Sequence, residues 1–253
     1  MGKQARIKAR EYRQAQAIAA TRTAKRTRLA MVAGGFVIAG LIAAIVAVVV
    51  TSGPKDGAST GASPGAAAVA PAGTTTGGAI LIGKAEAPVR VEIYLDYLCP
   101  YCGRFEKANS GDLESLVRDG KARVELHPLA FLDRLSSGTR YSTRTANAIA
   151  TVADRAPASV LAFSQALFSA QPAENSPGLS DDQIAALAVK AGVPQEVASA
   201  FTHRTFEPWI ASATDAAVKS GINGTPTVKI NGAVFQDLYT PGAFKQAVEA
   251  AGA

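Results

Sequence analysis

Two cysteines, Cys99 and Cys102, are the residues of this chain best suited to chemistry. They are the only cysteines in 253 residues. A disulfide between them would close a loop too short to constrain the unfolded chain appreciably. An exported domain stabilised by disulfides would usually carry several pairs with longer separations. The spacing therefore indicates thiol–disulfide exchange, in which the pair cycles between two thiols and a Cys99–Cys102 disulfide.

The position of the pair assigns a role to each cysteine. A strand is predicted just before Cys99, and a helix begins directly after it, with Pro100 suited to the first turn. The free N–H groups and the positive end of that helix stabilise a thiolate at Cys99. Cys102 lies one helical turn further on, near enough to resolve a mixed disulfide. We therefore predict that Cys99 is the nucleophile and Cys102 the resolving thiol.

Two other interpretations of the pair remain open. One is a short structural disulfide, and the other is half of a zinc site. A structural zinc site needs four ligands, and the two histidines, His127 and His203, lack paired spacing. His127 ends a predicted strand as a packing residue, and His203 ends a predicted helix, where a partial positive charge is favourable. No metal and no cofactor are predicted.

The elements that position the pair lie between residues 79 and 253. Predicted strands occupy residues 89–95, 122–127, 227–230 and 233–235, the last two joined by the turn Asn231-Gly232. Predicted helices occupy residues 100–118, 143–155, 159–169, 181–191, 194–202, 207–220 and 241–251. Ser180 is the expected N-cap of the helix at 181. Phe163, Phe168, Phe201, Phe206 and Trp209 are predicted to be core residues. This order predicts a mixed α/β sheet with an all-helical insertion at about residues 139–205.

A second motif, Gly224-Thr-Pro-Thr-Val-Lys-Ile-Asn-Gly, lies downstream of the insertion. A proline just before a strand fits either a strand that begins there or a cis peptide bond. Together with Leu95-Asp-Tyr-Leu-Cys-Pro-Tyr-Cys, this motif resembles DsbA-type thioredoxin-fold oxidoreductases, including membrane-anchored actinobacterial forms. The resemblance covers about residues 79–253, including the helical insertion, and implies a thioredoxin fold.

The resemblance also implies roles for several residues near the cysteines. Thr225–Pro226 is expected to be a cis peptide beside Cys99 and Cys102, with the Thr225 backbone free to pair with an extended substrate chain. The Thr225 hydroxyl is expected to tune the thiolate. Many thioredoxin-fold enzymes place a buried acid six residues before the first cysteine, where this chain has Ile93. Proton transfer to Cys102 is therefore expected to use Asp96 or water, with loop capping as the alternative role of Asp96.

The dipeptide between the cysteines governs the direction of electron flow. Stabilising the reduced thiolate makes the disulfide a stronger oxidant. Pro100 removes one backbone donor and Tyr101 adds no charge, so we expect less stabilisation than a histidine would give. Pro-Tyr is also the dipeptide of glutaredoxins, which usually reduce. Outside the cytoplasm new substrates arrive as dithiols, so we predict an oxidase of intermediate potential.

Residues 29–50 are predicted to form a transmembrane helix. The segment contains no charged residue, Asn, Gln or Pro, and its helix spans about 33 Å, enough for a hydrocarbon core of about 30 Å. The alternative is a cleaved signal peptide, whose apolar stretch is shorter and whose cleavage site follows closely. The attractive small-x-small site here, Ala68-Val69-Ala70, lies far downstream. We favour an uncleaved single-pass anchor in the cell membrane, with a cytoplasmic N terminus and an extracytoplasmic catalytic domain.

The flanks of this helix have unusual compositions. Residues 1–28 hold nine basic residues and one acidic residue, a net charge of +8, so the remainder sums to −2 within the total of +6. A nucleic-acid-binding domain would spread basic residues over a folded face. We therefore predict a basic cytoplasmic tail and no nucleic-acid partner. Residues 51–78 are almost entirely Gly, Ala, Ser, Thr and Pro, and are predicted to be a disordered tether.

The leading functional hypothesis is an extracytoplasmic oxidase that introduces disulfides into exported proteins. Its expected partners are exported protein thiols and a membrane protein, linked to quinone, that reoxidises the pair. A reductase or isomerase supplied with electrons across the membrane is an alternative. An alternative of another class is a non-catalytic module that binds peptides or a metal.

Overall fold

The computed structural model describes residues 68–75 and 77–253. The predicted basic tail at residues 1–28, the predicted transmembrane helix at residues 29–50 and residues 51–67 of the predicted tether lie outside the described residues. Within the described part, none of the helices combines the length and the apolar character needed to cross a bilayer.

Five strands form one mixed sheet in the order β1-β3-β2-β4-β5. The strands are β1 (Ile80–Ile82), β2 (Val89–Leu95), β3 (Ala122–Pro128), β4 (Thr227–Ile230) and β5 (Ala233–Val234). β2 and β3 run parallel, and the other three neighbouring pairs are antiparallel. The parallel pair needs a crossover connection, which α2 (Pro100–Arg118) supplies. At the β4–β5 turn, Asn231 and Gly232 adopt the positive φ angles of 48° and 87° that a tight hairpin requires.

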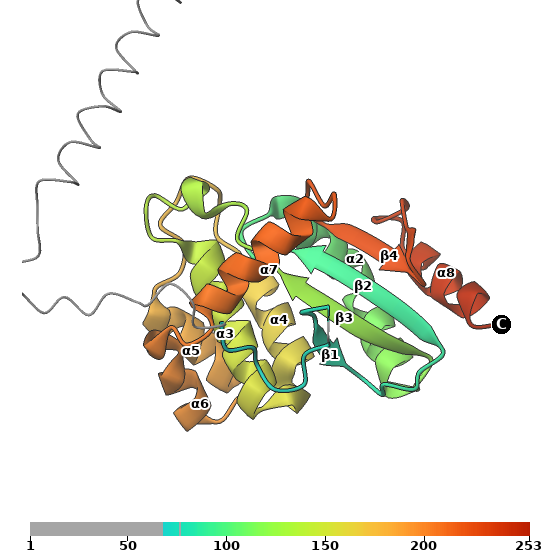
Figure 1. Cartoon of the computed structure of the whole chain (residues 1–253), viewed down its shortest axis with the longest axis horizontal. Coiled ribbons are helices and arrows are strands. Elements are labelled where there is room, and N and C mark those ends of the chain that lie inside the picture. The colour runs from blue at the N-terminus through green and yellow to red at the C-terminus, as the bar shows by residue number, and fades with distance from the viewer. Residues whose placement is uncertain (1–67, 76) are drawn as a thin grey trace, which may run out of the picture. The chain divides into compact units, whose positions relative to one another are not determined.

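Helices cover both faces of the sheet. α2 and α8 (Ala243–Ala251) contact each other and the sheet, whereas α7 (Glu207–Lys219) crosses the opposite face (Figure 1). Tyr94 of β2 packs with Ala217 of α7. Because successive side chains of a strand alternate between faces, the even-numbered residues of β2 face α7 and the odd-numbered ones face α2 and α8.

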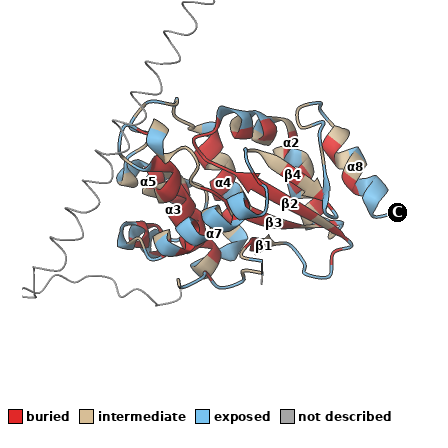
Figure 2. Ribbon diagram, turned by 45° about the horizontal axis from the view of Figure 1, so that its top comes forward, coloured by how far each residue is buried: buried red, intermediate tan, exposed pale blue. Residues whose placement is uncertain are grey.

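The chain between β3 and α7 is helical, as predicted. Its helices are α3 (Tyr141–Arg155), α4 (Val160–Ser169), α5 (Asp181–Lys190) and α6 (Gln195–Ser199), with short 3-10 turns η1 (Asp133–Leu135), η2 (Pro157–Ser159) and η3 (Ala200–His203). α3 is buried along most of its length between its neighbours (Figure 2). Ser180 caps α5 through a capping box with Gln183. The predicted core residues Phe163, Phe168, Phe201, Phe206 and Trp209 are all buried.

The N-terminal boundary differs from the sequence-based expectation. Pro71 is buried, Thr74 forms a β-bridge with Ile80, and the Leu81 N–H donates to the Gly73 carbonyl at 3.3 Å. The ordered domain therefore starts before Ala79, inside the predicted tether. Strand β1 was also not predicted. Strand β1 forms by pairing with β3, a segment remote in sequence, and Gly73 and Thr74 pair in turn with β1. Composition does not encode this remote pairing.

Candidate active site

Cys99 occupies the N-cap position of α2. Its carbonyl oxygen accepts hydrogen bonds from the N–H groups of Cys102 and Gly103 at 3.0 and 3.2 Å. Pro100 begins the helix and has no N–H that would need a partner. The sulfur of Cys99 therefore lies at the positive end of a 19-residue helix, as the sequence predicts.

The two thiols have opposite acidities. Both cysteines are free thiols in this structure, and their exposed fractions are 5% for Cys99 and 1% for Cys102. The hydrogen bond from the Cys102 thiol, followed by those from Thr225 and the backbone of the first turn, lowers the pKa of Cys99 to about 6 against the effect of burial. Burial raises the pKa of Cys102 well above its usual value. At neutral pH these shifts favour a thiolate at Cys99 beside a thiol at Cys102 that keeps its proton.

Thr225 and Pro226 lie directly beside the nucleophile. The Thr225–Pro226 peptide bond is cis, and the Cys99 sulfur lies 3.2 Å from the Thr225 carbonyl oxygen. The side chain of Thr225 also forms a hydrogen bond that lowers the pKa of Cys99. The structure therefore brings Thr225 and Pro226 beside Cys99, which precedes Thr225 by 126 positions in the chain.

Replacing Thr225 by valine should make Cys99 less acidic. Valine keeps the shape of threonine but removes the hydroxyl that favours the thiolate, so the pKa of Cys99 should rise by about half a unit to one unit. Titration of the thiolate ultraviolet absorbance checks this value. Thr202→Val, in the helical insertion, is the matched control, and an unchanged pKa in Thr225→Val would contradict the assigned role.

Asp96 connects the catalytic loop to two neighbouring segments. It is fully buried; its Oδ1 accepts hydrogen bonds from the Leu98 N–H at 2.8 Å and the Ser142 hydroxyl at 2.7 Å. Its Oδ2 accepts one from the Leu132 N–H at 2.9 Å. Burial raises the pKa of Asp96 to about 6, although these hydrogen bonds oppose the shift. The contacts favour the loop-capping role over a direct role in proton transfer.

Gln171 is a site residue that the sequence did not reveal. It follows α4 in the helical insertion, and its Nε2 donates to the carbonyl oxygens of Tyr97 and Cys99, each at 2.9 Å. Ser142 and Leu132, the partners of Asp96, were missed in the same way. No local pattern marks these residues, because each contacts the catalytic loop from a distant part of the chain.

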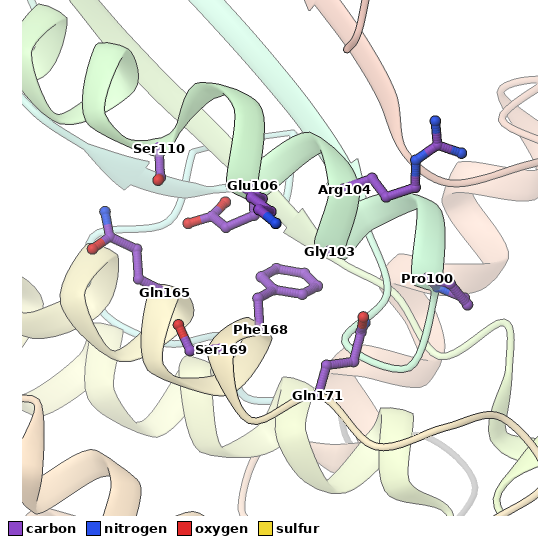
Figure 3. A pocket seen from close by; sticks show the side chains of 10 residues that line it. Pro100, Gly103, Arg104, Glu106, Ser110, Gln165, Phe168, Ser169 and Gln171 are labelled. Atoms are coloured by element: carbon purple, nitrogen blue, oxygen red, sulfur yellow. The ribbon is translucent and has the colours of Figure 1, made fainter. Parts of the chain in front are cut away.

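Two hollows flank the first turn of α2. The first, a groove beside Cys99, is lined by Tyr101, Phe131, Leu132, Ile222 and Thr225, among others. Tyr101, which lines this groove, is 58% exposed. The second lies between α2 and α4 and is lined by Glu106, Gln165, Phe168 and Gln171, among others (Figure 3). Of these two hollows only the first is lined by Cys99.

One cluster of possible metal ligands occurs among the described residues. Glu92, Glu125 and His127 place ligand atoms within 4.8 Å of one another. Arg90 lies 3.6 Å from both carboxylates and Arg123 lies 3.9 Å from that of Glu125, so two guanidinium groups offset the two negative charges. The ring of His127 stacks on Tyr94 with centroids 4.1 Å apart, and burial lowers its pKa to about 4. No cluster in this part of the chain joins a histidine to the cysteine pair, which leaves the zinc interpretation without support.

Known proteins share this architecture. Residues 75–250 match the family described as thioredoxin. The chain resembles the reduced disulfide bond oxidoreductase DsbG of Mycobacterium tuberculosis, with 28% identity and a TM-score of 0.61 over 70% of this chain and 88% of that one. It also resembles MdbA, a thiol-disulfide oxidoreductase from Actinomyces oris, with 27% identity and a TM-score of 0.63 over 71% and 88% of the two chains. For reduced DsbA of Mycobacterium tuberculosis the identity is 27% and the TM-score 0.59, over 68% and 91%.

A curated relative of another kind is the serine/threonine-protein kinase PknE of Mycobacterium tuberculosis. It is 34% identical over 117 residues, which make up 45% of this chain and 21% of the kinase. The chain thus spans about a fifth of the length of that relative. The family match covers most of the chain, and the similar solved structures are oxidoreductases that act on disulfides. The chain therefore belongs to the thioredoxin family and is a DsbA-like thiol–disulfide oxidoreductase.

Proposed function

We propose that this protein is an extracytoplasmic oxidase that introduces disulfides into exported proteins through Cys99 and Cys102. Residues 29–50 anchor it in the cell membrane, residues 1–28 remain in the cytoplasm, and a quinone-linked membrane protein reoxidises the pair. The observation that carries the proposal is the asymmetric cysteine pair at the start of α2, with Cys99 in an open groove beside the Thr225 carbonyl.

The chemistry is a two-step exchange. A substrate thiolate attacks the sulfur of Cys99 in the disulfide form, the bond to Cys102 breaks, and a mixed disulfide forms. A second substrate thiolate then attacks the substrate sulfur of that mixed disulfide and releases Cys99 as a thiolate. The substrate loses two electrons and two protons and gains one disulfide. The enzyme gains the two electrons as a Cys99 thiolate and a Cys102 thiol, so one proton goes to Cys102 and the other to solvent. Cys99 is a good leaving group because its pKa of about 6 is low.

The acidity of Cys99 supports the direction of the reaction. A low thiol pKa stabilises the reduced form, and stabilising the reduced form makes the disulfide more oxidising. The Thr225 backbone, adjacent to the sulfur, is placed to pair with an extended substrate chain. An unfolded exported protein offers both an extended backbone and free thiols.

Equilibration with glutathione tests the direction. The full-length protein in detergent micelles is incubated in glutathione buffers, and the fraction of Cys99–Cys102 disulfide is quantified. An oxidase requires a potential clearly above that of thioredoxin, about −270 mV. A value near that of thioredoxin would reject the oxidase proposal and favour the reductase.

Two experiments in cells test the location and the clients. The Cys102→Ala variant has one cysteine, Cys99, so a membrane-impermeant thiol reagent should label it in intact cells as fully as after permeabilisation. Labelling that requires permeabilisation would refute an extracytoplasmic domain. The same variant should accumulate mixed disulfides with exported proteins by the reverse exchange: Cys99 attacks a protein disulfide, and Cys102, which would resolve the mixed disulfide by attacking the Cys99 sulfur, is absent. Trapped cytoplasmic proteins would refute the assigned substrates.

A further inference from the structure

Gln171 links the helical insertion to the backbone of the nucleophile. Both N–H groups of its carboxamide are used, one on the carbonyl of Tyr97 and one on the carbonyl of Cys99. Because both partners are carbonyl oxygens, only the nitrogen of the carboxamide can occupy this position. The orientation of the side chain is therefore fixed by the chemistry of its partners.

The surroundings of Gln171 hold it in this position. The backbone N–H of Gln171 donates to the Phe168 carbonyl oxygen at the end of α4, at 3.2 Å. Phe168 packs on Tyr97 with ring centroids 4.8 Å apart, and the Tyr97 hydroxyl donates to the Ser164 hydroxyl of α4 at 3.0 Å. Gln171, which donates, and Tyr97, which accepts, are thus both held by contacts with α4.

Gly103 provides the space for the carboxamide. A Cβ at this position in α2 would collide with Gln171 Oε1. In Figure 3 the Gln171 side chain points from the insertion toward the first turn of α2, where Gly103 lies. Glycine at this position leaves room for the carboxamide, whereas the methyl group of alanine would force the end of the Gln171 side chain to move.

The Cys99 carbonyl accepts three hydrogen bonds, from Cys102 N–H, Gly103 N–H and Gln171. The first two come from the helix, and the third fixes the peptide plane from outside it. The orientation of this plane determines how the Cys99 sulfur faces the Cys102 thiol and the first-turn N–H groups. The positive end of the amide dipole also offsets the negative carbonyl oxygen near the thiolate.

We propose that Gln171 is a positioning residue that fixes the backbone of Cys99 and thereby the geometry of the Cys99–Cys102 pair. The inference rests on the proposed function, since it concerns the same pair, and it gives the helical insertion a part in the redox chemistry. The insertion does more than cover the sheet: through Gln171 it sets how stable the reduced pair is.

Three variants test this role in the full-length protein in detergent micelles. Gln171→Met keeps the length of the side chain but donates no hydrogen bond, and Gln171→Glu places an acceptor where a donor is needed. Gly103→Ala leaves Gln171 intact but displaces its carboxamide. The matched control is Gln165→Met, because Gln165 lines the same hollow from α4 (Figure 3) and makes no side-chain hydrogen bond within the described residues.

The readouts are the thiolate titration of Cys99 and the equilibrium constant with glutathione. Gln171→Met and Gly103→Ala should raise the pKa of Cys99 by about half a unit, about a threefold change in its ionisation constant. Gln171→Glu should raise it further, and Gln165→Met should leave it unchanged. In Gln171→Met and Gly103→Ala the glutathione equilibrium should shift toward the Cys99–Cys102 disulfide by about threefold, because the Cys99 thiolate is less stable.

Gly103→Ala separates positioning from mere stability. Alanine favours the helix. If Gln171 had only a structural role, Gly103→Ala would therefore be at least as stable as wild type, and the pKa of Cys99 would be unchanged. Unchanged titration curves in Gln171→Met and Gly103→Ala would overturn the inference, as would an equal shift in Gln165→Met. If Gln171→Met fails to fold, Gly103→Ala decides. The titration needs no substrate, so it gives an answer even if the oxidase proposal fails.

Discussion

Replacing Cys99 by serine should abolish both dithiol oxidation and disulfide reduction, with a loss of about a thousandfold or more. Cys99 lines the groove that also contains Thr225, and its pKa of about 6 makes it mainly thiolate at neutral pH. Cys102 is 1% exposed and lines neither of the two hollows beside α2. Cys102→Ala should therefore block turnover but leave the Cys99 thiolate able to attack a disulfide substrate and expel one of its sulfurs, which a stoichiometric mixed disulfide with a model disulfide would demonstrate.

The pH dependence of alkylation gives a quantitative form of this prediction. Only the thiolate reacts with iodoacetamide, so the rate of the reduced protein should be constant above about pH 7. Below the pKa of about 6 it should fall by about tenfold per pH unit. One equivalent of reagent should react quickly, at Cys99. Equal reactivity of Cys102, or a midpoint near that of a free cysteine, would contradict the assignment of the two roles.

Replacing Asp96 by alanine should cause the largest loss of stability, about 3 kcal/mol in the free energy of unfolding of the reduced protein. The substitution leaves the Leu98 N–H, the Leu132 N–H and the Ser142 hydroxyl without their acceptor. Each buried polar group without a partner costs about 1–3 kcal/mol, and some of this is recovered because a buried charge is removed. Chemical denaturation checks the value. Asp96→Asn should lose less, because its amide oxygen still accepts from two of the donors.

The stability difference between wild type and Asp96→Asn should depend on pH. Burial raises the pKa of Asp96 to about 6 from 3.8, so the folded state binds the proton more tightly than the unfolded state does. The resulting stabilisation is fully present below pH 3.8 and is lost as the pH rises through 6. The deficit of the variant should therefore be larger at pH 5 than at pH 7.5, by about 1 kcal/mol. A deficit that grows with pH would contradict this sign.

The stability of Asp96→Asn and its rate of mixed-disulfide resolution together separate the two roles considered for Asp96, loop capping and proton transfer. If Asp96 only caps the loop, Asp96→Asn should be less stable than wild type, but its rate of mixed-disulfide resolution per folded molecule should be unchanged. A proton-transfer residue slows the resolution by Cys102 as well. The observed hydrogen bonds to Leu98, Leu132 and Ser142 favour the first outcome.

Much of the fold followed from local patterns in the sequence. The alternation in Val89–Leu95, the Asn231-Gly232 turn and the N-cap at Ser180 each depend on residues close together in the chain. The order of these elements was enough to predict a mixed sheet with a helical insertion. The cysteine pair at the start of a helix identified the chemistry, because spacing and helix polarity are local properties.

Other features were decided only by the tertiary structure. β1 is three residues long and exists because β3 pairs with it. The Cys99 sulfur meets the Thr225 carbonyl across 126 positions, and Gln171 meets the Cys99 carbonyl across 72. The largest cause of the low Cys99 pKa is the Cys102 thiol rather than the helix N–H groups that the sequence suggested. Hydrogen bonds depend on distances of a few tenths of an ångström between remote segments, and only the packed chain sets those distances.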